Sequence, residues 1–187
     1  MQRTLCFYGN PILRVKGSKI KIFNDDLKII IKDMIETMHE QNGIGLAAQQ
    51  IGLAKQICVV DLDCYKDRDI DFNYSYDGKP LPLELFMPLA LINPDIQIIN
   101  KDLYVREEGC LSFPNILGMV KRPTSIICKF QDVSGNMHCL EADGLLARCI
   151  LHEIDHLNGV LFIDKMQKSD LHKNKKKINQ LKRKYKG

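Results

Sequence analysis

Apolar residues recur at helical spacing in the segment that follows Asn24. They are Leu27, Ile30, Ile31, Met34, Ile35 and Met38. Positions i, i+3, i+4 and i+7 share one face of a helix, so the pattern predicts an amphipathic helix. Asn24 and the two aspartates after it suit its start, because they cap free amides and complement the helix dipole. We expect this helix to end at Gly43.

A second helix is predicted from Asp143-Gly144 to about Leu157, ending before Gly159. Its apolar residues lie on most of its sides rather than on one stripe. They are Leu145, Leu146, Cys149, Ile150, Leu151, Ile154 and Leu157. A helix that is apolar nearly all round belongs in the interior of a protein.

Short apolar runs predict strands between these helices. They cover residues 57–62, 96–99, 103–105, 124–130 and 137–140. The last two flank a Ser-Gly-Asn turn and favour a hairpin. We therefore expect an α+β fold, with small, mostly antiparallel sheets packed around the second helix and further helices outside.

Residues 63–88 form a polar stretch rich in Tyr and Asp, which we interpret as an insertion between strands. A solvated loop is the simpler hypothesis, and a lid or partner contact is the alternative.

The end of the chain is strongly basic. From Lys165 onward there are ten Lys or Arg and a single acid, Asp170, which gives this part a charge of +9. Because the net charge of the whole chain is +4, residues 1–164 carry −5. Apolar residues at helical spacing predict a basic helix with a narrow apolar stripe. They are Leu171, Ile178, Leu181 and Tyr185. We divide the chain into a catalytic domain, 1–165, and a helical tail, 166–187.

Composition fits a single globular domain. The 187 residues are 45% hydrophobic and 27% charged, which is ordinary for that class. The first residues show no secretory signal, and the longest apolar stretch, Leu85 to Ile92, is broken by Pro88 and too short to span a bilayer. Seven cysteines without a CxxC pair favour free thiols, and we expect a cytoplasmic protein without a membrane contact.

Two histidines four residues apart mark the second helix as a candidate metal site. His152 and His156 would lie on one face, with Glu153 beside them. This H-E-x-x-H pattern is typical of metal hydrolases that use the glutamate as general base. The pattern also arises by chance in helices, but two unpaired histidines on a buried helix would be costly.

A catalytic metal needs a third protein ligand. Downstream, only His172 follows, and it lies in the tail. Cys110 is the better candidate, because Gly109 before it permits close backbone approach and a thiolate suits a borderline-soft divalent ion. The alternative for a single cysteine is a small buried hydrophobe.

A glycine-rich segment, Gly43-Ile44-Gly45-Leu46-Ala47-Ala48-Gln49-Gln50, follows the first helix. Its small residues would let a backbone edge approach a ligand, with the amide of Gln50 at the end. The alternative is a helix C-cap and a turn into the next strand.

Together the three segments resemble the bacterial peptide deformylases. That family carries G-x-G-L-A-A-x-Q, E-G-C-L-S and H-E-x-D-H in the same order, as residues 43–50, 108–112 and 152–156 do here. The likeness covers about residues 1–165. Gln49 departs from the usual proline, which should alter loop stiffness, and the insertion at 63–88 is longer than in compact members.

The resemblance implies removal of the formyl group from N-formylmethionine at the start of new polypeptides, releasing formate. Cys110, His152 and His156 would hold one metal, with Glu153 moving the proton. The family likeness places the oxyanion donors at the Gln50 side chain and the Leu111 backbone N–H. The family generally uses Fe(II), while Zn, Ni and Co also suit this ligand set.

Further residues are predicted around this centre. Ile44, Leu145 and Cys149 would line a methionine slot, although ordinary core packing is the alternative for the latter two. The Gly43–Leu46 edge, which contains Gly45, could pair with the substrate backbone as an added strand, and Gly109 is a further predicted substrate-binding residue. Glu108 and Asp155 could orient the imidazoles, or could instead pair with Arg122; the sequence leaves both open.

The predicted partner is the nascent formylmethionyl polypeptide. The basic tail is either a solvated helix packed lightly on the body or a contact with ribosomal RNA, which some related enzymes make; no DNA partner is expected. Two functions compete with this one. A general metallopeptidase would not need the Cys110 and Gly43 segments. A catalytically idle nucleic-acid or ribosome-binding protein that retains a structural metal would not need Glu153.

Overall fold

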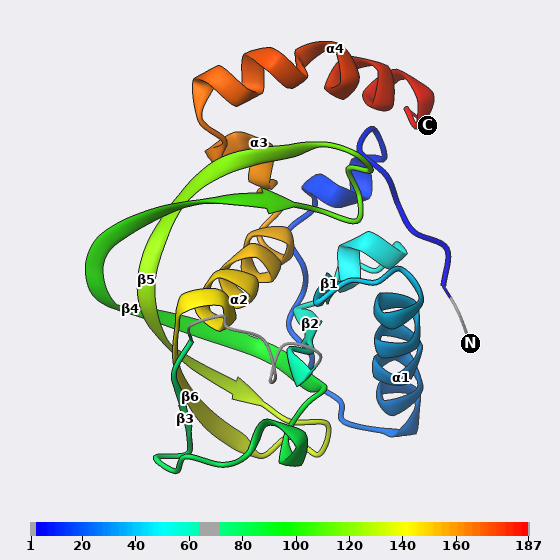
Figure 1. Ribbon diagram of the computed structural model, residues 1–187. Helices are drawn as coiled ribbons and strands as arrows, with labels where there is room; N and C mark the ends of the chain where they lie inside the picture. The colour runs from blue at the N-terminus through cyan, green and yellow to red at the C-terminus, as the bar shows by residue number, and fades with distance from the viewer. Residues whose placement is uncertain (1–2, 64–71, 187) are drawn as a thin grey trace.

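Antiparallel strands form one hydrogen-bonded sheet that curves around a central helix in the computed structural model, which describes residues 3–63 and 72–186 (Figure 1). The strand order is β1-β2-β4-β5-β6-β3. The strands are β1 (Gly45–Ala47), β2 (Ile57–Val60), β3 (Tyr74–Tyr76), β4 (Leu89–Gly109), β5 (Leu117–Gln131) and β6 (Met137–Asp143). The predicted α+β class is confirmed, and the small sheets expected from the sequence are joined into one.

Strand β4 is much longer than its sequence indicated. The prediction of two separate strands at 96–99 and 103–105 was wrong, because both belong to one strand of 21 residues. Its register with β5 shifts between Ile92 and Asp95 and twice more between Ile98 and Leu103. Such irregularities bend a strand and interrupt its alternation of apolar and polar residues. The bends let β4 and β5 curve around the central helix.

The hairpin predicted at Ser134–Asn136 is confirmed, since β5 pairs with β6 in antiparallel register. The Asp132 carboxylate accepts backbone N–H bonds from Ser134 and Asn136, both at 2.8 Å, and so fixes the turn.

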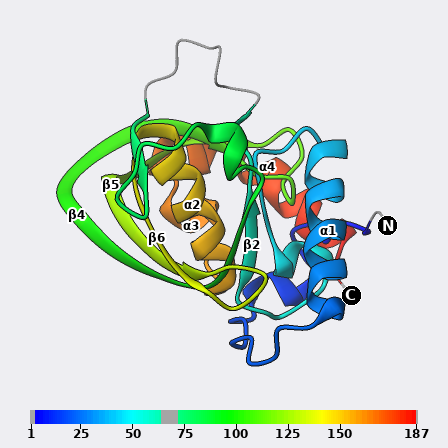
Figure 2. The same cartoon turned by 90° about the horizontal axis from the view of Figure 1, so that it is seen from below.

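Helix α2 (Gly144–Leu157) is the predicted second helix and lies inside the curve of the sheet, while α1 (Asp25–Glu40) lies on the far side of β2 (Figure 2). The Asn24 side chain caps α1 by accepting the N–H of Leu27 at 3.1 Å. The helix ends at Glu40, and the left-handed residue after it is Asn42 (φ 54°) rather than Gly43. The Gly43 N–H still closes the turn on the Met38 carbonyl at 2.9 Å.

The predicted insertion contains a strand. The hypothesis of a solvated loop at 63–88 was wrong for β3, which pairs with β6 through Tyr74–Tyr76. The rings of Tyr74 and Tyr76 pack on Phe86, with centroid distances of 5.3 and 5.0 Å. Residues 64–71 of this stretch lie outside the described residues.

Among the described residues, apolar side chains form three clusters. The first lies between α2 and the sheet, and the second lies under α1. The third joins the segment before α1 to Phe113, to the short helix α3 (Phe162–Lys165), which the sequence pattern did not predict, and to α4 (Lys168–Lys184). Ile178 anchors α4 in this cluster with 6% exposure. None of the helices within the described ranges is both long enough and apolar enough to cross a membrane.

Candidate metal centre and active site

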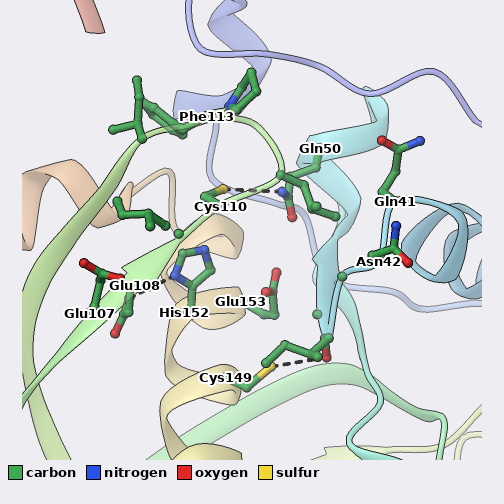
Figure 3. A pocket seen from close by; sticks show the side chains of 18 of the residues that line it. Gln41, Asn42, Gln50, Glu107, Glu108, Cys110, Phe113, Cys149, His152 and Glu153 are labelled. Carbon is green, nitrogen blue, oxygen red and sulfur yellow. Dashed lines mark hydrogen bonds and ion pairs between the residues drawn. The ribbon is translucent and has the colours of Figure 1, made fainter. Parts of the chain in front are cut away.

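A cavity of about 640 Å³ opens where β1, the end of β4 and helix α2 meet. The segments predicted to carry the chemistry all reach it: the glycine-rich segment, the loop after β4 and the H-E-x-x-H turn of α2. Figure 3 shows His152 and Glu153 extending from α2 toward Cys110 and Gln50. Sequence segments separated by about a hundred positions therefore contribute to one site.

Three side chains of metal-ligand type converge beside this cavity. The ligand atoms of Cys110, His152 and His156 all lie within 4.8 Å of one another. The Cys110 sulfur is 3.3 Å from His156 Nε2. One thiolate and two imidazoles suit Zn(II), Fe(II), Co(II) or Ni(II), so these residues fit a divalent metal. Because the ligands bind as thiolate and neutral imidazole, metal binding at this site would release protons.

His152 is oriented by Glu108 on β4. Its Nδ1 lies 3.1 Å from Glu108 Oε2, which leaves Nε2 free to face the cation site. Burial opposes a charge on His152, but hydrogen bonds with Cys110 and Glu108 outweigh it and raise its pKa to about 10. For His156, burial and the nearby charge of His152 lower the pKa well below its usual value.

Arginines surround the Glu108 carboxylate. Arg122 donates to both oxygens, at 2.6 and 2.9 Å, and Arg148 donates to Oε1 at 2.7 Å. Burial would raise the pKa of Glu108, yet the hydrogen bonds from His152 and Arg122 hold it well below its usual range. Glu108 thus contacts His152 and pairs with Arg122 at the same time. Orientation of an imidazole and pairing with Arg122, which the sequence left as alternatives, are therefore both fulfilled by Glu108.

Asp155 has different partners. Its carboxylate accepts from Arg122 at 2.8 Å and from Lys165 at 2.7 Å. It therefore fixes the far side of Arg122, and the geometry links it to His152 only through Arg122 and Glu108. Arg148 was not predicted from the sequence, although an arginine on an otherwise apolar helix was a signal for a buried ionic role. It also donates to the backbone carbonyl of Tyr104 at 2.7 Å.

Glu153 is a buried carboxyl group with a free oxygen. It is 4% exposed, and its Oε2 atom has no hydrogen-bond partner among residues 3–63 and 72–186. Burial disfavours its charged form and raises its pKa to about 7. A carboxyl group with a pKa near neutrality can accept and return a proton under ordinary conditions.

Gly45 leaves room for Glu153. A Cβ atom at this position would overlap Glu153 Oε1 and would lie 3.0 Å from the Cys149 sulfur. The absence of a side chain therefore lets β1 approach both residues. Gly109 is constrained in the same way, because its Cβ would lie 2.7 Å from Leu117 Cδ2.

Gln50 is held so that its amide nitrogen faces the candidate metal site. Its Oε1 accepts the Ala47 N–H at 2.8 Å, and its Nε2 lies 3.6 Å from the Cys110 sulfur and 3.3 Å from Ser112 Oγ. The acceptor end is thus fixed by β1 and the donor end is directed inward. Leu111, the second predicted oxyanion residue, follows Cys110 directly and lines the same cavity.

The predicted substrate residues lie together. Ile44, Gly45, Gly109, Leu145 and Cys149 all line the cavity. The Cys149 thiol donates to the Ile44 carbonyl at 3.3 Å, and burial raises its pKa well above the usual value. A protonated thiol of this kind is an apolar wall rather than a nucleophile.

Gln49, where the resemblance predicted altered loop stiffness, is held by hydrogen bonds. It is fully buried, and its Nε2 donates to the carbonyls of Val15 and Leu157, both at 3.3 Å. These bonds attach the glycine-rich segment to the segment before α1 and to the end of α2.

Comparisons with known proteins agree with this geometry. The profile of the family described as polypeptide deformylase matches residues 2–172. A peptide deformylase of Opitutus terrae is 52% identical over 169 residues, which cover 90% of this chain and 86% of that protein. One of Methylacidiphilum infernorum is 41% identical, covering 96% and 92%.

Solved structures share the fold. The crystal structure of peptide deformylase from Plasmodium falciparum superposes with a TM-score of 0.83 at 35% identity, covering 98% of this chain and 97% of that one. A plant peptide deformylase gives the same TM-score at 34% identity, covering 98% and 90%.

Proposed function

The chain belongs to the polypeptide deformylase family, and we propose that Cys110, His152 and His156 hold the divalent metal on which its catalysis depends. The enzyme removes the N-formyl group from the N-terminal formylmethionine of newly made polypeptides and releases formate. A divalent metal at this site supplies Lewis acidity, which can lower the pKa of water to about 7.

Glu153 moves the proton in this proposal. Its Oε2 atom, which has no hydrogen-bond partner in the described part of the chain, accepts a proton from the attacking water. The same carboxyl group then delivers it to the nitrogen that leaves when the formyl C–N bond breaks. The pKa of about 7, which burial produces, suits both transfers. The convergence of this carboxyl group with one sulfur and two imidazoles is the observation that carries the assignment.

Two donors stabilise the oxyanion that forms on the formyl oxygen. These are Gln50 Nε2, which its bond to Ala47 directs inward, and the backbone N–H of Leu111. Donors fixed in a buried site need no reorganisation as negative charge develops.

The methionine side chain enters the apolar part of the cavity formed by Ile44, Leu145 and Cys149. The substrate backbone lies along β1 at Gly45 and passes Gly109, since both glycines line the cavity. Backbone pairing of this kind makes affinity depend little on the later side chains.

The test compares formate release from formyl-Met-Ala-Ser with cleavage of its peptide bonds. Wild type should release formate alone. Glu153→Ala and the isosteric Glu153→Gln should lose at least about 10²-fold in turnover, the range of a general acid–base contribution, while metal content stays unchanged. Equal turnover by either variant, or peptide-bond cleavage by wild type, would reject the assignment.

For the metal itself we favour Fe(II), with Zn, Ni or Co as ions that the protein could carry after purification. The donor set supports each of them, and affinity order alone does not select one. Anaerobic purification with elemental analysis, followed by reloading of the stripped protein with each ion, tests this. The highest formate release with zinc alone would contradict iron as the working metal.

Helix α4 is a candidate ribosome contact. It stands on the outside of the fold, anchored by Ile178, and its lysines are exposed (Figure 1). Contacts with RNA phosphates would make binding fall steeply with salt. In ribosome sedimentation at low salt, exchanging Lys175, Lys176 and Lys182 for Gln should reduce co-sedimentation.

A matched control keeps the same change in net charge. Exchanging the exposed Lys16, Lys19 and Lys21 for Gln should leave sedimentation nearly unchanged. If both triple variants lose binding equally, the contact is nonspecific and the α4 proposal fails. We also propose a cytoplasmic location, because the substrate is a newly made polypeptide and the candidate partner of α4 is the ribosome.

A further inference from the structure

Arg148 is a buried charged residue on α2 that the mechanism above does not use. It lies one helical turn before His152, so the two side chains leave the helix on the same face. Arg148 is 6% exposed. A buried guanidinium group is tolerated when its charge is paired and its N–H groups have acceptors, so its contacts show what it holds in place.

The Glu108 carboxylate is where Arg148, Arg122 and His152 meet. Its Oε1 accepts from Arg148 Nη1 at 2.7 Å and from Arg122 Nε at 2.6 Å. Its Oε2 accepts from Arg122 Nη2 at 2.9 Å and lies 3.1 Å from His152 Nδ1. Figure 3 shows this carboxylate beside the imidazole ring. Both oxygens are therefore fixed, one of them by both arginines and the other by Arg122 and the imidazole.

The two arginines hold Glu108 from different elements. Arg122 lies on β5 and also pairs with Asp155 at 2.8 Å, so its charge is shared between two carboxylates. Arg148 lies on α2 and pairs with Glu108. The helix that carries His152 thus contributes a second side chain to the same carboxylate.

Backbone carbonyls fix the guanidinium group of Arg148. Its Nη1 donates to the Val120 carbonyl on β5 at 3.1 Å, and its Nη2 donates to the Tyr104 carbonyl on β4 at 2.7 Å. A planar guanidinium group can reach several acceptors at once, whereas the ammonium group of lysine is a single point charge on a flexible chain. Arg148 therefore sets the position of α2 against both strands beside Glu108.

From these contacts we propose that Arg148 is a positioning residue for the metal centre, which holds Glu108 against His152 and so fixes the orientation of the imidazole. The inference rests on the proposed function, in which His152 is a metal ligand. Without Arg148, α2 would contact this carboxylate through His152 alone among the described residues, and the two groups could turn together. Partners that orient a ligating imidazole typically change metal affinity by about 10- to 100-fold.

A simpler role for Arg148 would be to attach α2 to the sheet. Loss of the residue would weaken the fold in either case, so a measurement of stability does not separate the two roles. They differ in the route of the effect, because a positioning residue acts on metal binding through Glu108.

The experiment measures the dissociation constant of Co(II) for protein stripped of metal, by anaerobic competition with a chelator. Arg148→Met introduces an apolar side chain of similar length and should weaken Co(II) binding by about 10- to 100-fold. Arg148→Lys keeps a charge that can reach Glu108, so its loss should be smaller. An unchanged dissociation constant in Arg148→Met would overturn the proposal.

A double-mutant cycle with Glu108→Gln tests the route. In the Glu108→Gln background, Arg148→Met should weaken Co(II) binding by less than about twofold, because the carboxylate on which it acts is gone. An equally large loss in both backgrounds would show that Arg148 acts only by attaching α2, and the proposal would fail. If Arg148→Met does not fold, Arg148→Lys takes its place in the cycle.

Lys165→Met is the matched control, because it makes the same change in charge and in side-chain type. Lys165 contacts Asp155 at 2.7 Å, and its side chain is 41% exposed. It belongs to the same ionic network but does not touch Glu108, so the dissociation constant should stay at the wild-type value. A loss equal to that of Arg148→Met would show that any missing charge in the network weakens metal binding, and would also reject the proposal.

The outcomes separate this inference from the assignment of function. If wild type binds Co(II) and releases formate while Arg148→Met binds Co(II) equally well, the positioning role is rejected and the proposed function stands. If wild type binds no Co(II), or if Cys110→Ala binds it as tightly as wild type, the metal assignment is rejected and the inference fails with it.

Discussion

The sheet has two edge strands of the same length and opposite construction. β1 is built from Gly45, Leu46 and Ala47, all buried, and it borders the active-site cavity. β3 is built from two tyrosines around a serine, all half-buried. Side chains close this second edge: the rings pack on Phe86, and the Asp77 carboxylate accepts the Cys139 N–H at 2.8 Å.

The difference reflects what each edge must do. An exposed strand edge can pair with any extended chain, and proteins usually prevent this. Side chains and turns cover β3, whereas β1 has small residues where we propose that the polypeptide substrate approaches. Changes at β1 should therefore affect catalysis, and changes at β3 should affect stability.

The largest effect is expected at Gln50, whose side chain β1 holds in place. Gln50→Leu removes the Nε2 donor, and loss of one oxyanion donor typically costs about 3 to 4 kcal/mol of barrier, or about 10²- to 10³-fold in kcat. Metal content should be unchanged in elemental analysis. Gln50→Glu keeps an acceptor for the Ala47 N–H, so an equal loss of kcat in both variants assigns the effect to the donor. Retention of wild-type kcat in Gln50→Leu would exclude the oxyanion role.

Gly45→Ala tests β1 directly. The added methyl group would overlap Glu153 Oε1, so β1 or Glu153 must move. Misplacement of a catalytic group by about 1 Å can cost about 10²-fold in kcat/KM. The matched change on the other edge is Ser75→Ala, for which we expect wild-type formate release. If both variants release formate at the same rate, β1 is no more important for catalysis than β3.

Phe86→Ala should have the reverse effect. It removes the ring against which Tyr74 and Tyr76 pack, and two aromatic contacts contribute about 1 to 3 kcal/mol to the free energy of unfolding. Urea denaturation should show this loss, and kcat/KM should remain at the wild-type value. A large fall in kcat/KM with unchanged stability would link β3 to the active site.

Local patterns in the sequence predicted the parts of the fold that depend on local spacing. The helical rhythm after Asn24 predicted α1, and the all-round apolar segment predicted α2 as a buried helix. The spacing of His152 and His156 placed two imidazoles on one face. Cys110 was selected as the third ligand because Gly109 precedes it and a thiolate suits a divalent ion, and the family resemblance then supported that choice. No local pattern relates its position to α2.

Features that depend on long-range pairing were missed. The bends of β4 interrupt its alternation, so one strand looked like two. Strand β3 was visible as Tyr-Ser-Tyr before an Asp-Gly turn, but its pairing with β6 is set by residues more than sixty positions away. Arg148 gains its partners only in the folded chain. The division at residue 165 stays a prediction.

The smallest effect concerns the pH dependence of the β3 edge. His138 Nδ1 lies 2.7 Å from Asp77, and its Nε2 lies 3.4 Å from Asp132. Burial would lower the pKa of His138, but the hydrogen bonds to these carboxylates outweigh it and raise the pKa above 6.5. Protonated His138 therefore stabilises the folded state fully at pH values below the pKa that it has in the unfolded chain. This stabilisation is lost as pH rises through the higher pKa of His138 in the folded chain.

Because Asp77 is 42% exposed, solvent screening should keep this contribution below about 1 kcal/mol. Thermal unfolding at pH values of about 5.5 and 8.5 measures it, since His titrates between them. Between the lower and the higher pH, the Tm of wild type should fall further than the Tm of His138→Gln, in which the side chain no longer titrates. Identical pH slopes would show that the ion pair does not stabilise this edge, and the closure of β3 would then depend on its aromatic packing alone.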